Sequence, residues 1–140
     1  MDRQEIIQTL KQYRGLRLEC ERLCKRITTK KNDMYDIKAC VMSAANVRTG
    51  EMADRVERVV EMMDSMVDYY SRKMEECEKS ERQIAEMIDR ISDSEERGVL
   101  FLHYIEGKTF MEIGEEMYLS ERTIWYRHNN AINKLCALVQ

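Results

Sequence analysis

The chain has 140 residues, which is enough for one or two small domains and too few for a large enzyme. Its formal net charge is −3, 35% of its residues are charged, and it has five glycines and no proline. This composition favours long helices. No apolar run approaches the roughly 20 residues that cross a bilayer, and no apolar leader opens the sequence. We therefore predict an all-α, cytoplasmic protein without a membrane partner.

Residues 2–31 are predicted to form the first helix. Apolar side chains recur there every seven residues, with further apolar residues between them, as in helices that wind around one another. The pattern weakens over residues 32–50, which we predict to be a connection with one short helix at residues 36–44. The repeating positions are Ile6, Tyr13, Cys20 and Ile27, with Leu10, Leu16, Leu23 and Cys24 between them.

Residues 51–91 carry a second seven-residue repeat. A helix of about 41 residues would be roughly 60 Å long and needs a partner. Pairing with the first helix gives a coiled-coil hairpin, the predicted domain of residues 1–91. Pairing the same helices between two chains is equally permissible and would give a homodimer. The repeat comprises Val56, Met63, Tyr70, Cys77, Ile84 and Ile91, with Val59, Val60, Met66, Val67, Met74, Met87 and Ile88 between them.

The second predicted domain, residues 92–140, begins at the cluster Ser92-Asp93-Ser94-Glu95-Glu96. Side-chain oxygens in such a cluster accept hydrogen bonds from the free amides of a first helical turn. The helix that follows is predicted to end near Gly107, a residue suited to a left-handed C-cap.

Two short helices joined by a tight turn are predicted next. A small residue is needed where their axes cross, and Gly114 lies there. Ser120 suits the N-cap of the second short helix. The predicted inward-facing residues are Phe110, Ile113, Met117, Leu119 and Ile124, with Ala131, Leu135 and Leu138 continuing the buried stripe.

Several positions of this second domain form a known pattern. They are residues 99–104, Gly107, Ile113-Gly114-Glu115 and Ser120-Glu121-Arg122-Thr123-Ile124, followed by Arg127, Ala131 and Leu135. The pattern resembles region 4 of sigma-70-type RNA polymerase factors. The whole chain is also similar to small phage and prophage proteins akin to the ArpU-type regulators of phage late genes. The resemblance implies a helix-turn-helix and a role in transcription control.

One position departs from that pattern. Tyr118 stands in the turn where the family usually has Gly. A tyrosine with positive φ costs about 1–2 kcal/mol, so we expect either a turn of different geometry or some loss of stability.

In helix-turn-helix proteins the second helix enters the major groove with its N-terminal half against the base edges. On a helical period that starts at Ser120, Arg122 can bind guanine, Asn129 can bind adenine, and Glu121 can accept from cytosine. Trp125 and Tyr126 can contact thymine methyl groups or the sugar-phosphate wall. The predicted phosphate contacts are Arg127, Lys134 and the Thr123 hydroxyl.

The charge of the second domain is uneven. Residues 92–140 contain 5 Lys and Arg against 8 Asp and Glu, whereas residues 122–140 contain three bases and no acid. We predict a sequence-specific DNA-binding transcriptional regulator whose partner is double-stranded DNA. The alternative is a protein-interaction adaptor that contacts RNA polymerase or another helical partner without reading DNA, using Glu112, Glu115 and Glu116.

An enzyme is not predicted. The sequence has no phosphate-binding loop and no nucleophile elbow, and long helical coils make poor pockets. The odd number of cysteines argues against a disulfide framework. Cys20 and Cys24 lie one helical turn apart without a second Cys or His pair nearby, so we predict buried thiols and no metal or cofactor. His103 and His128 are predicted to be structural.

Overall fold

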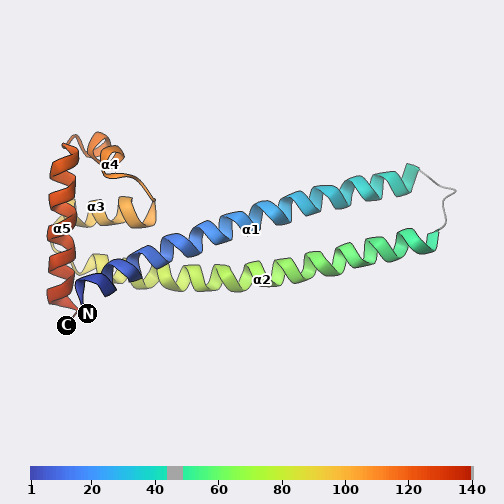
Figure 1. Ribbon diagram of the computed structural model, residues 1–140, viewed down its shortest axis with the longest axis horizontal. Helices are drawn as coiled ribbons and strands as arrows, with labels where there is room; N and C mark the ends of the chain where they lie inside the picture. Colours follow the sequence, from blue (N-terminus) through green and yellow to red (C-terminus); the bar gives the residue numbers. More distant parts are fainter. Residues whose placement is uncertain (44–48, 140) are drawn as a thin grey trace. The chain divides into compact units, whose positions relative to one another are not determined.

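The computed structural model describes residues 1–43 and 49–139, and these residues form helices without any strand. The prediction of an all-α protein is therefore confirmed for the described part of the chain. The helices are α1 (Arg3–Ser43), α2 (Thr49–Asp89), α3 (Ser94–Leu100), the π-helical segment η1 (Phe101–Ile105), α4 (Phe110–Met117) and α5 (Glu121–Leu138) (Figure 1).

The predicted connection at residues 32–50 was wrong in its extent. Helix α1 continues to Ser43, and α2 begins at Thr49. No proline or glycine occurs between residues 16 and 49, so Asn32 and Asp33 only weaken the helix and do not end it. Residues 44–48, near the C-terminal end of the predicted connection, lie outside the described residues.

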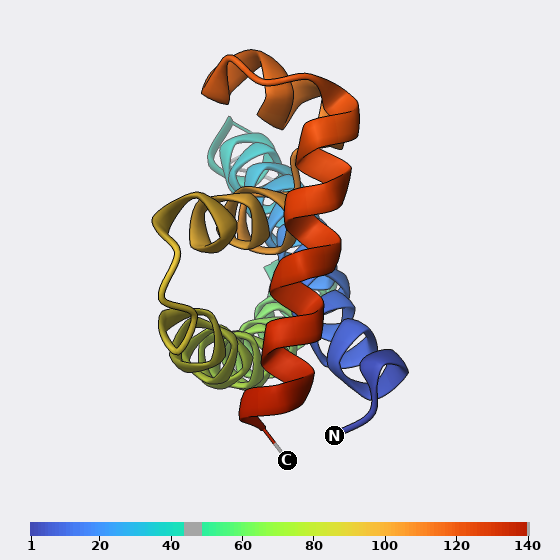
Figure 2. The same cartoon turned by 90° about the vertical axis from the view of Figure 1, so that its left-hand side faces the viewer.

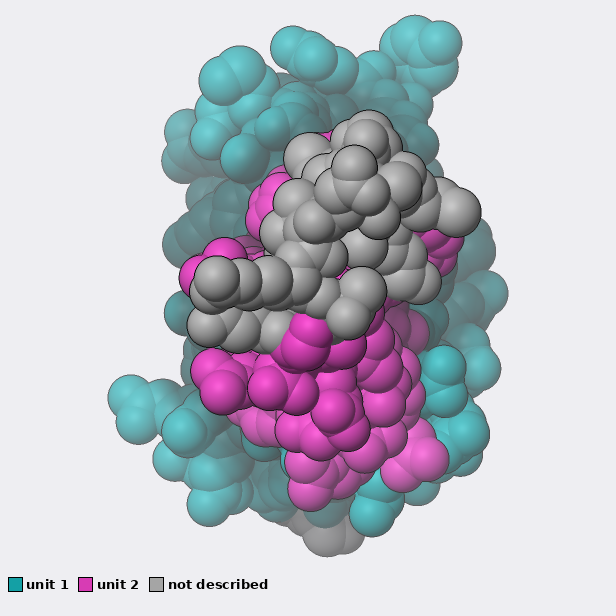
Figure 3. Space-filling view, turned by 90° about the vertical axis from the view of Figure 1, so that its right-hand side faces the viewer, with its two compact units in different colours: residues 1–17, 76–140 teal, residues 18–75 magenta. Residues whose placement is uncertain are grey.

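The chain divides into two compact units. Unit 1 comprises residues 1–17 and 76–140, and unit 2 comprises residues 18–75 (Figure 3). The predicted domain boundary between residues 91 and 92 thus falls inside unit 1. The reason is that the first turns of α1 and the last turns of α2 belong to the same compact unit as the four C-terminal helical segments.

Side-chain contacts join α1 to α2 within each unit. In unit 1 the Tyr13 hydroxyl lies 3.3 Å from a Glu81 carboxylate oxygen. In unit 2, Lys73 Nζ lies 3.7 Å from a Glu19 carboxylate oxygen. Each unit therefore contains a part of α1 and a part of α2 that contact one another.

The seven-residue repeat is buried to different degrees in the two units. In unit 1, Ile6, Tyr13 and Ile84 are fully buried. In unit 2, Met63 and Tyr70 at the same repeat are only half-buried. Two helices bury one stripe each, and a closed apolar core needs further elements on top of them. Unit 1 has those elements in α3, η1, α4 and α5.

Helix α3 begins as the sequence predicts. The Asp93 side chain is the N-cap and accepts hydrogen bonds from the backbone N–H groups of Glu95 and Glu96, at 2.8 and 3.2 Å. The Glu96 amide is the main reason that the pKa of the Asp93 carboxyl lies below its usual value.

The end of this helical stretch is less regular than predicted. Residues 101–105 are π-helical, and the Glu106 amide donates to the Phe101 carbonyl five residues earlier, at 3.2 Å. Gly107 then adopts φ +74°, and the Lys108 amide donates to the Leu102 carbonyl at 2.9 Å. The left-handed cap predicted at Gly107 is confirmed, whereas the π-helical turn has no signal in the sequence.

Candidate nucleic-acid interface

Helices α4 and α5 are held on α3 by one apolar cluster. Its buried centre is Val99, Ile113 and Ile124, and Leu102, Phe110, Met117 and Leu119 pack around it. Helix α5 contacts both α3 and α4 (Figure 2). All five residues predicted to face inward in the two short helices therefore belong to this cluster.

The predicted stripe along α5 is right at two of its three positions. Ala131 and Leu135 are fully buried, but Leu138 is 50% exposed. The stripe moves to Ile132, which is fully buried and was not predicted. Leu138 is the last residue of α5, where little structure remains to cover it.

The turn between α4 and α5 closes tightly around Gly114. The Leu119 amide donates to the Gly114 carbonyl at 2.9 Å, and a Cβ placed on Gly114 would lie 2.6 Å from the Leu119 carbonyl oxygen. Only glycine fits such an approach, which confirms its predicted place at the crossing.

Tyr118 carries the left-handed residue of this turn. Its backbone has φ 58° and ψ 39°, and its side chain is 94% exposed. The turn therefore has the backbone shape that a glycine would adopt without strain. Tyrosine therefore stands at a left-handed position of this turn.

Replacing Tyr118 with glycine is expected to raise the free energy of unfolding by up to about 1 kcal/mol. The change removes the left-handed strain and loses almost no packing, while glycine costs some backbone entropy. Chemical denaturation of the full chain measures it. Tyr118→Ala keeps the strain and should leave stability near the original value, so equal gains from both variants would contradict this account.

The N-terminal half of α5 presents an exposed aromatic and basic surface. Ser120 caps the helix by accepting from the Thr123 amide at 3.2 Å. Glu121 and Arg122 are exposed, and Trp125 and Tyr126 are 49% and 48% exposed.

Contacts among these side chains organise that surface. Arg122 Nη2 donates to the Tyr126 hydroxyl at 3.3 Å, and its guanidinium carbon lies 5.7 Å from the centre of the Tyr126 ring. The Trp125 and Tyr126 rings meet edge to face, with centroids 5.1 Å apart. Three predicted site residues, Arg122, Trp125 and Tyr126, are therefore brought together, and Glu121 is exposed on the first turn of the same helix. We call these four residues the α5 surface.

The other predicted site residues already have partners within the protein. The Thr123 hydroxyl is 2.7 Å from the Ser120 hydroxyl and belongs to the cap. Arg127 Nη2 lies 2.9 Å from a Glu95 carboxylate oxygen on α3. Lys134 Nζ lies 2.7 Å from Glu96, whose side chain is almost completely buried. Much of the local positive charge of α5 is thus balanced by the acids of α3.

Asn129 is engaged by a residue from the other end of the sequence. Arg3 Nη2 donates to the Asn129 carboxamide oxygen at 2.7 Å, and Arg3 Nη1 donates to that of Asn133 at 2.6 Å. Arg3 was not among the predicted site residues, because nothing in its local pattern links it to α5. The pair brings a guanidinium to the middle of α5, next to the predicted adenine-reading residue.

Behind the α5 surface lies a buried cluster of aromatic and imidazole rings. His128 Nε2 is 2.6 Å from the Tyr104 hydroxyl, and its ring centroid lies 5.7 Å from that of His103. His103 Nδ1 is 2.8 Å from the Lys108 carbonyl oxygen, so it donates there. Burial lowers the pKa of His128 to about 4 and raises that of Tyr104 to about 12. Both histidines therefore hold the structure together, as predicted.

Among residues 1–43 and 49–139, no group of three or more His, Cys, Asp or Glu side chains could hold a metal ion. None of the helices described combines the length and apolar character that crossing a membrane requires. Of the two cysteines one turn apart, Cys20 is buried as predicted and Cys24 is exposed. That exposure corrects the prediction of a second buried thiol.

Residues 36–136 match a protein family described as "Protein of unknown function (DUF1492)". The chain belongs to this family. The matched range runs from the end of α1 into α5, so it includes the Gly114 turn and the whole α5 surface. No curated protein and no solved structure matches the chain.

Proposed function

We propose that this DUF1492 protein is a sequence-specific DNA-binding transcriptional regulator, with α4 and α5 as its helix-turn-helix. In this proposal the N-terminal half of α5 enters the major groove, as the recognition helix of such motifs does. We further propose that this helix-turn-helix is of the sigma-70 region 4 type. The protein would then regulate transcription in a phage or prophage, as a protein similar to the ArpU-type regulators of late genes.

The observation that carries the proposal is the α5 surface. The first turns of α5 expose a tryptophan and a tyrosine beside an arginine. Exposed aromatic side chains that lie together usually mark a binding site, because contact of apolar surface with water is unfavourable. The same side chains suit a groove, since arginine binds guanine at two positions and aromatic rings contact thymine methyl groups and sugars.

Several predicted site residues have partners within the protein, which reduces the number of residues proposed to contact DNA. Arg122 is the proposed base-reading residue, with Trp125 and Tyr126 beside it. Asn129 is already bound by Arg3, so we propose that the pair acts together and that Arg3 neutralises a phosphate. Lys134 and Arg127 contribute less, because their charge is balanced by α3.

A second candidate is an adaptor that binds RNA polymerase or another helical protein. It is favoured by the outer face of α4, where Glu112, Glu115 and Glu116 are exposed beside Met111, which is 58% exposed. Acids on the first helix of the motif would repel the DNA backbone and would suit a basic protein partner.

Arg122→Ala is expected to weaken binding to a preferred DNA duplex by about tenfold or more, with a smaller loss on a scrambled duplex. A good bidentate base contact provides about 1–3 kcal/mol of discrimination. The preferred duplex is first selected from a random pool with the unmodified protein. Binding of both duplexes is then followed over a salt series through Trp125, the only tryptophan of the chain.

Arg82→Ala is the matched control, because Arg82 is an exposed arginine that lies on α2 and not on α5. It removes the same charge and should leave the preference between the two duplexes unchanged. If Arg122→Ala and Arg82→Ala behave alike, or if selection from the random pool enriches no sequence, the adaptor becomes the better proposal. Lys134→Ala is a poor probe, since it leaves the buried Glu96 carboxylate without its cation.

A further inference from the structure

Unit 2 exposes apolar side chains on one flank of α2. Val60 and Val67 are 39% and 43% exposed. They lie seven residues apart, each directly after a half-buried residue of the α2 stripe, Val59 and Met66. The two valines therefore form a row beside the contact between α1 and α2.

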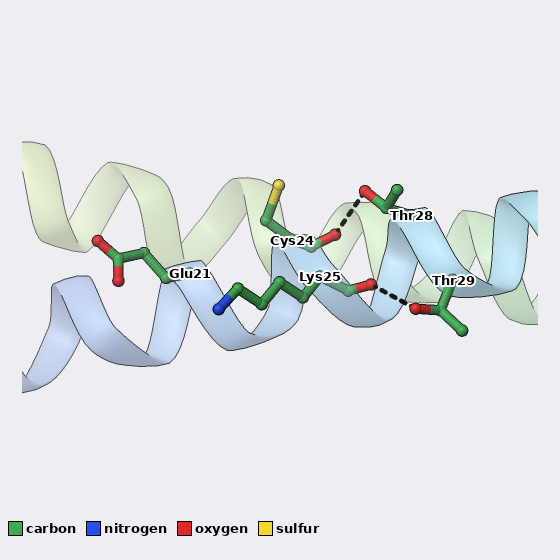
Figure 4. Close-up of a pocket in the computed structure, with 5 residues that line it drawn as sticks. All are labelled: Glu21, Cys24, Lys25, Thr28 and Thr29. Atoms are coloured by element: carbon green, nitrogen blue, oxygen red, sulfur yellow. Dashed lines mark hydrogen bonds between the residues drawn. The ribbon is translucent and has the colours of Figure 1, made fainter.

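The corresponding flank of α1 is a shallow groove. Cys24 follows the half-buried Leu23 as Val60 follows Val59, and its thiol is exposed. In an antiparallel pair such positions of the two helices lie on the same side. The groove is lined by Glu21, Cys24, Lys25, Thr28 and Thr29, and both threonine hydroxyls donate to carbonyls of α1, at 2.9 and 3.0 Å (Figure 4). Because these hydroxyls are bonded within the helix, the groove offers the threonine methyl groups and the Cys24 thiol beside the charged side chains of Glu21 and Lys25.

The opposite flank of the pair is different. Tyr69 lies there with Lys73 Nζ 5.7 Å from its ring centre, and Lys73 also pairs with Glu19 at 3.7 Å. Tyr69 remains 43% exposed on that flank, but the ion pair between α2 and α1 lies there. The flank with Val60, Val67 and Cys24 is therefore the better candidate for an interface.

The two rims of this candidate interface differ in charge. On α2 the exposed residues Glu61, Asp64 and Asp68 follow one another at helical spacing. On α1 the groove is lined by the exposed Lys25 together with Glu21. An α2 that met another α2 would bring acids together, whereas an α1 that meets an α2 brings the acids to Lys25.

We propose that unit 2 binds unit 2 of a second copy of this chain through this flank, with α1 of each copy against α2 of the other. A two-fold arrangement makes the acid-to-base contact twice. The apolar rows of the two copies then pack against one another, bury the half-buried residues between α1 and α2, and form a four-helix bundle. The proposal does not depend on DNA binding.

The first test is the mass of the full chain in solution by light scattering over a concentration series. The unmodified protein is expected to have twice the mass of one chain. Val67→Lys places a charge in the apolar row and should raise the dimer dissociation constant at least tenfold. Met62→Lys, equally exposed at 42% but on the opposite flank, should leave the dimer intact. A single-chain mass at every concentration would overturn the proposal, as would dissociation by Met62→Lys but not by Val67→Lys.

The second test uses paired charge reversals. Lys25→Glu and Asp64→Lys each place like charges across the interface twice, so each variant alone should dimerise about tenfold more weakly at low salt. In a mixture of the two variants, both contacts join opposite charges, and a heterodimer should form. Circular dichroism checks that each variant remains helical. A mixture no more dimeric than its components would show that α1 does not face α2 of the other copy.

Discussion

Replacing Gly114 with alanine is expected to lower the free energy of unfolding by about 1–3 kcal/mol. The new methyl group would lie 2.6 Å from the Leu119 carbonyl oxygen and 3.5 Å from the Glu121 nitrogen. Both are backbone atoms of the turn and cannot rotate away. Relief of the clash moves the turn, together with the 2.9 Å hydrogen bond from the Leu119 amide to the Gly114 carbonyl. The loss exceeds the gain of up to about 1 kcal/mol that alanine brings to a helix.

Gly98→Ala is the matched control for that experiment. Gly98 lies in α3, and a Cβ placed there meets nothing closer than the Met117 methyl carbon at 4.0 Å. Helix propensity then predicts that Gly98→Ala stabilises the protein by up to about 1 kcal/mol. Denaturant unfolding of both variants measures the two effects. If Gly114→Ala is as stable as Gly98→Ala, α4 and α5 do not approach as closely as described.

Acid is expected to destabilise the protein through His128. Its pKa in the folded state is lowered from 6.5 to about 4, first by burial and then by the charges of His103, Arg3 and Lys11. Below a pH of about 6.5 the unfolded chain therefore binds a proton that the folded chain does not. The stability present above that pH falls as the pH approaches about 4, by up to about 3 kcal/mol.

The measurement compares unfolding free energies at about pH 7 and about pH 4 for the original chain and for His128→Gln. Glutamine retains an acceptor for the Tyr104 hydroxyl but does not titrate, so the variant should lose about 3 kcal/mol less over this range. Other acid-sensitive groups, such as Asp93, remain in both proteins and cancel in the comparison. Equal losses would mean that His128 is not held in a neutral form by its surroundings.

Features set by a few neighbouring residues were predictable from the sequence. The caps at Asp93, Gly107 and Ser120 depend on hydrogen bonds that reach only a few residues along the chain, so composition and spacing reveal them. The glycine at the α4–α5 crossing and the inward-facing residues around it followed from helical periodicity in the same way.

Features that depend on distant residues were not predictable. The charge of Lys134 is balanced by Glu96 and that of Arg127 by Glu95, because α3 packs beside α5. Nothing in the sequence of α5 reports this. The bond between Arg3 and Asn129 joins residues 126 positions apart. The end of α1 was misjudged for a different reason, since a weaker apolar repeat reduces packing without breaking a helix.

The split composition of unit 1 has a consequence for biosynthesis. The ribosome adds roughly 5–20 residues per second, beginning at the N-terminus. Residues 1–17 are therefore synthesised several seconds before α5. During that time Ile6, Leu10 and Tyr13 lack most of the core that later buries them. Residues 18–75, in contrast, are contiguous and can pair as soon as they are made. Their pairing sets α1 against α2 and thereby shortens the loop that the last helices must close, which lowers the entropic cost of completing unit 1.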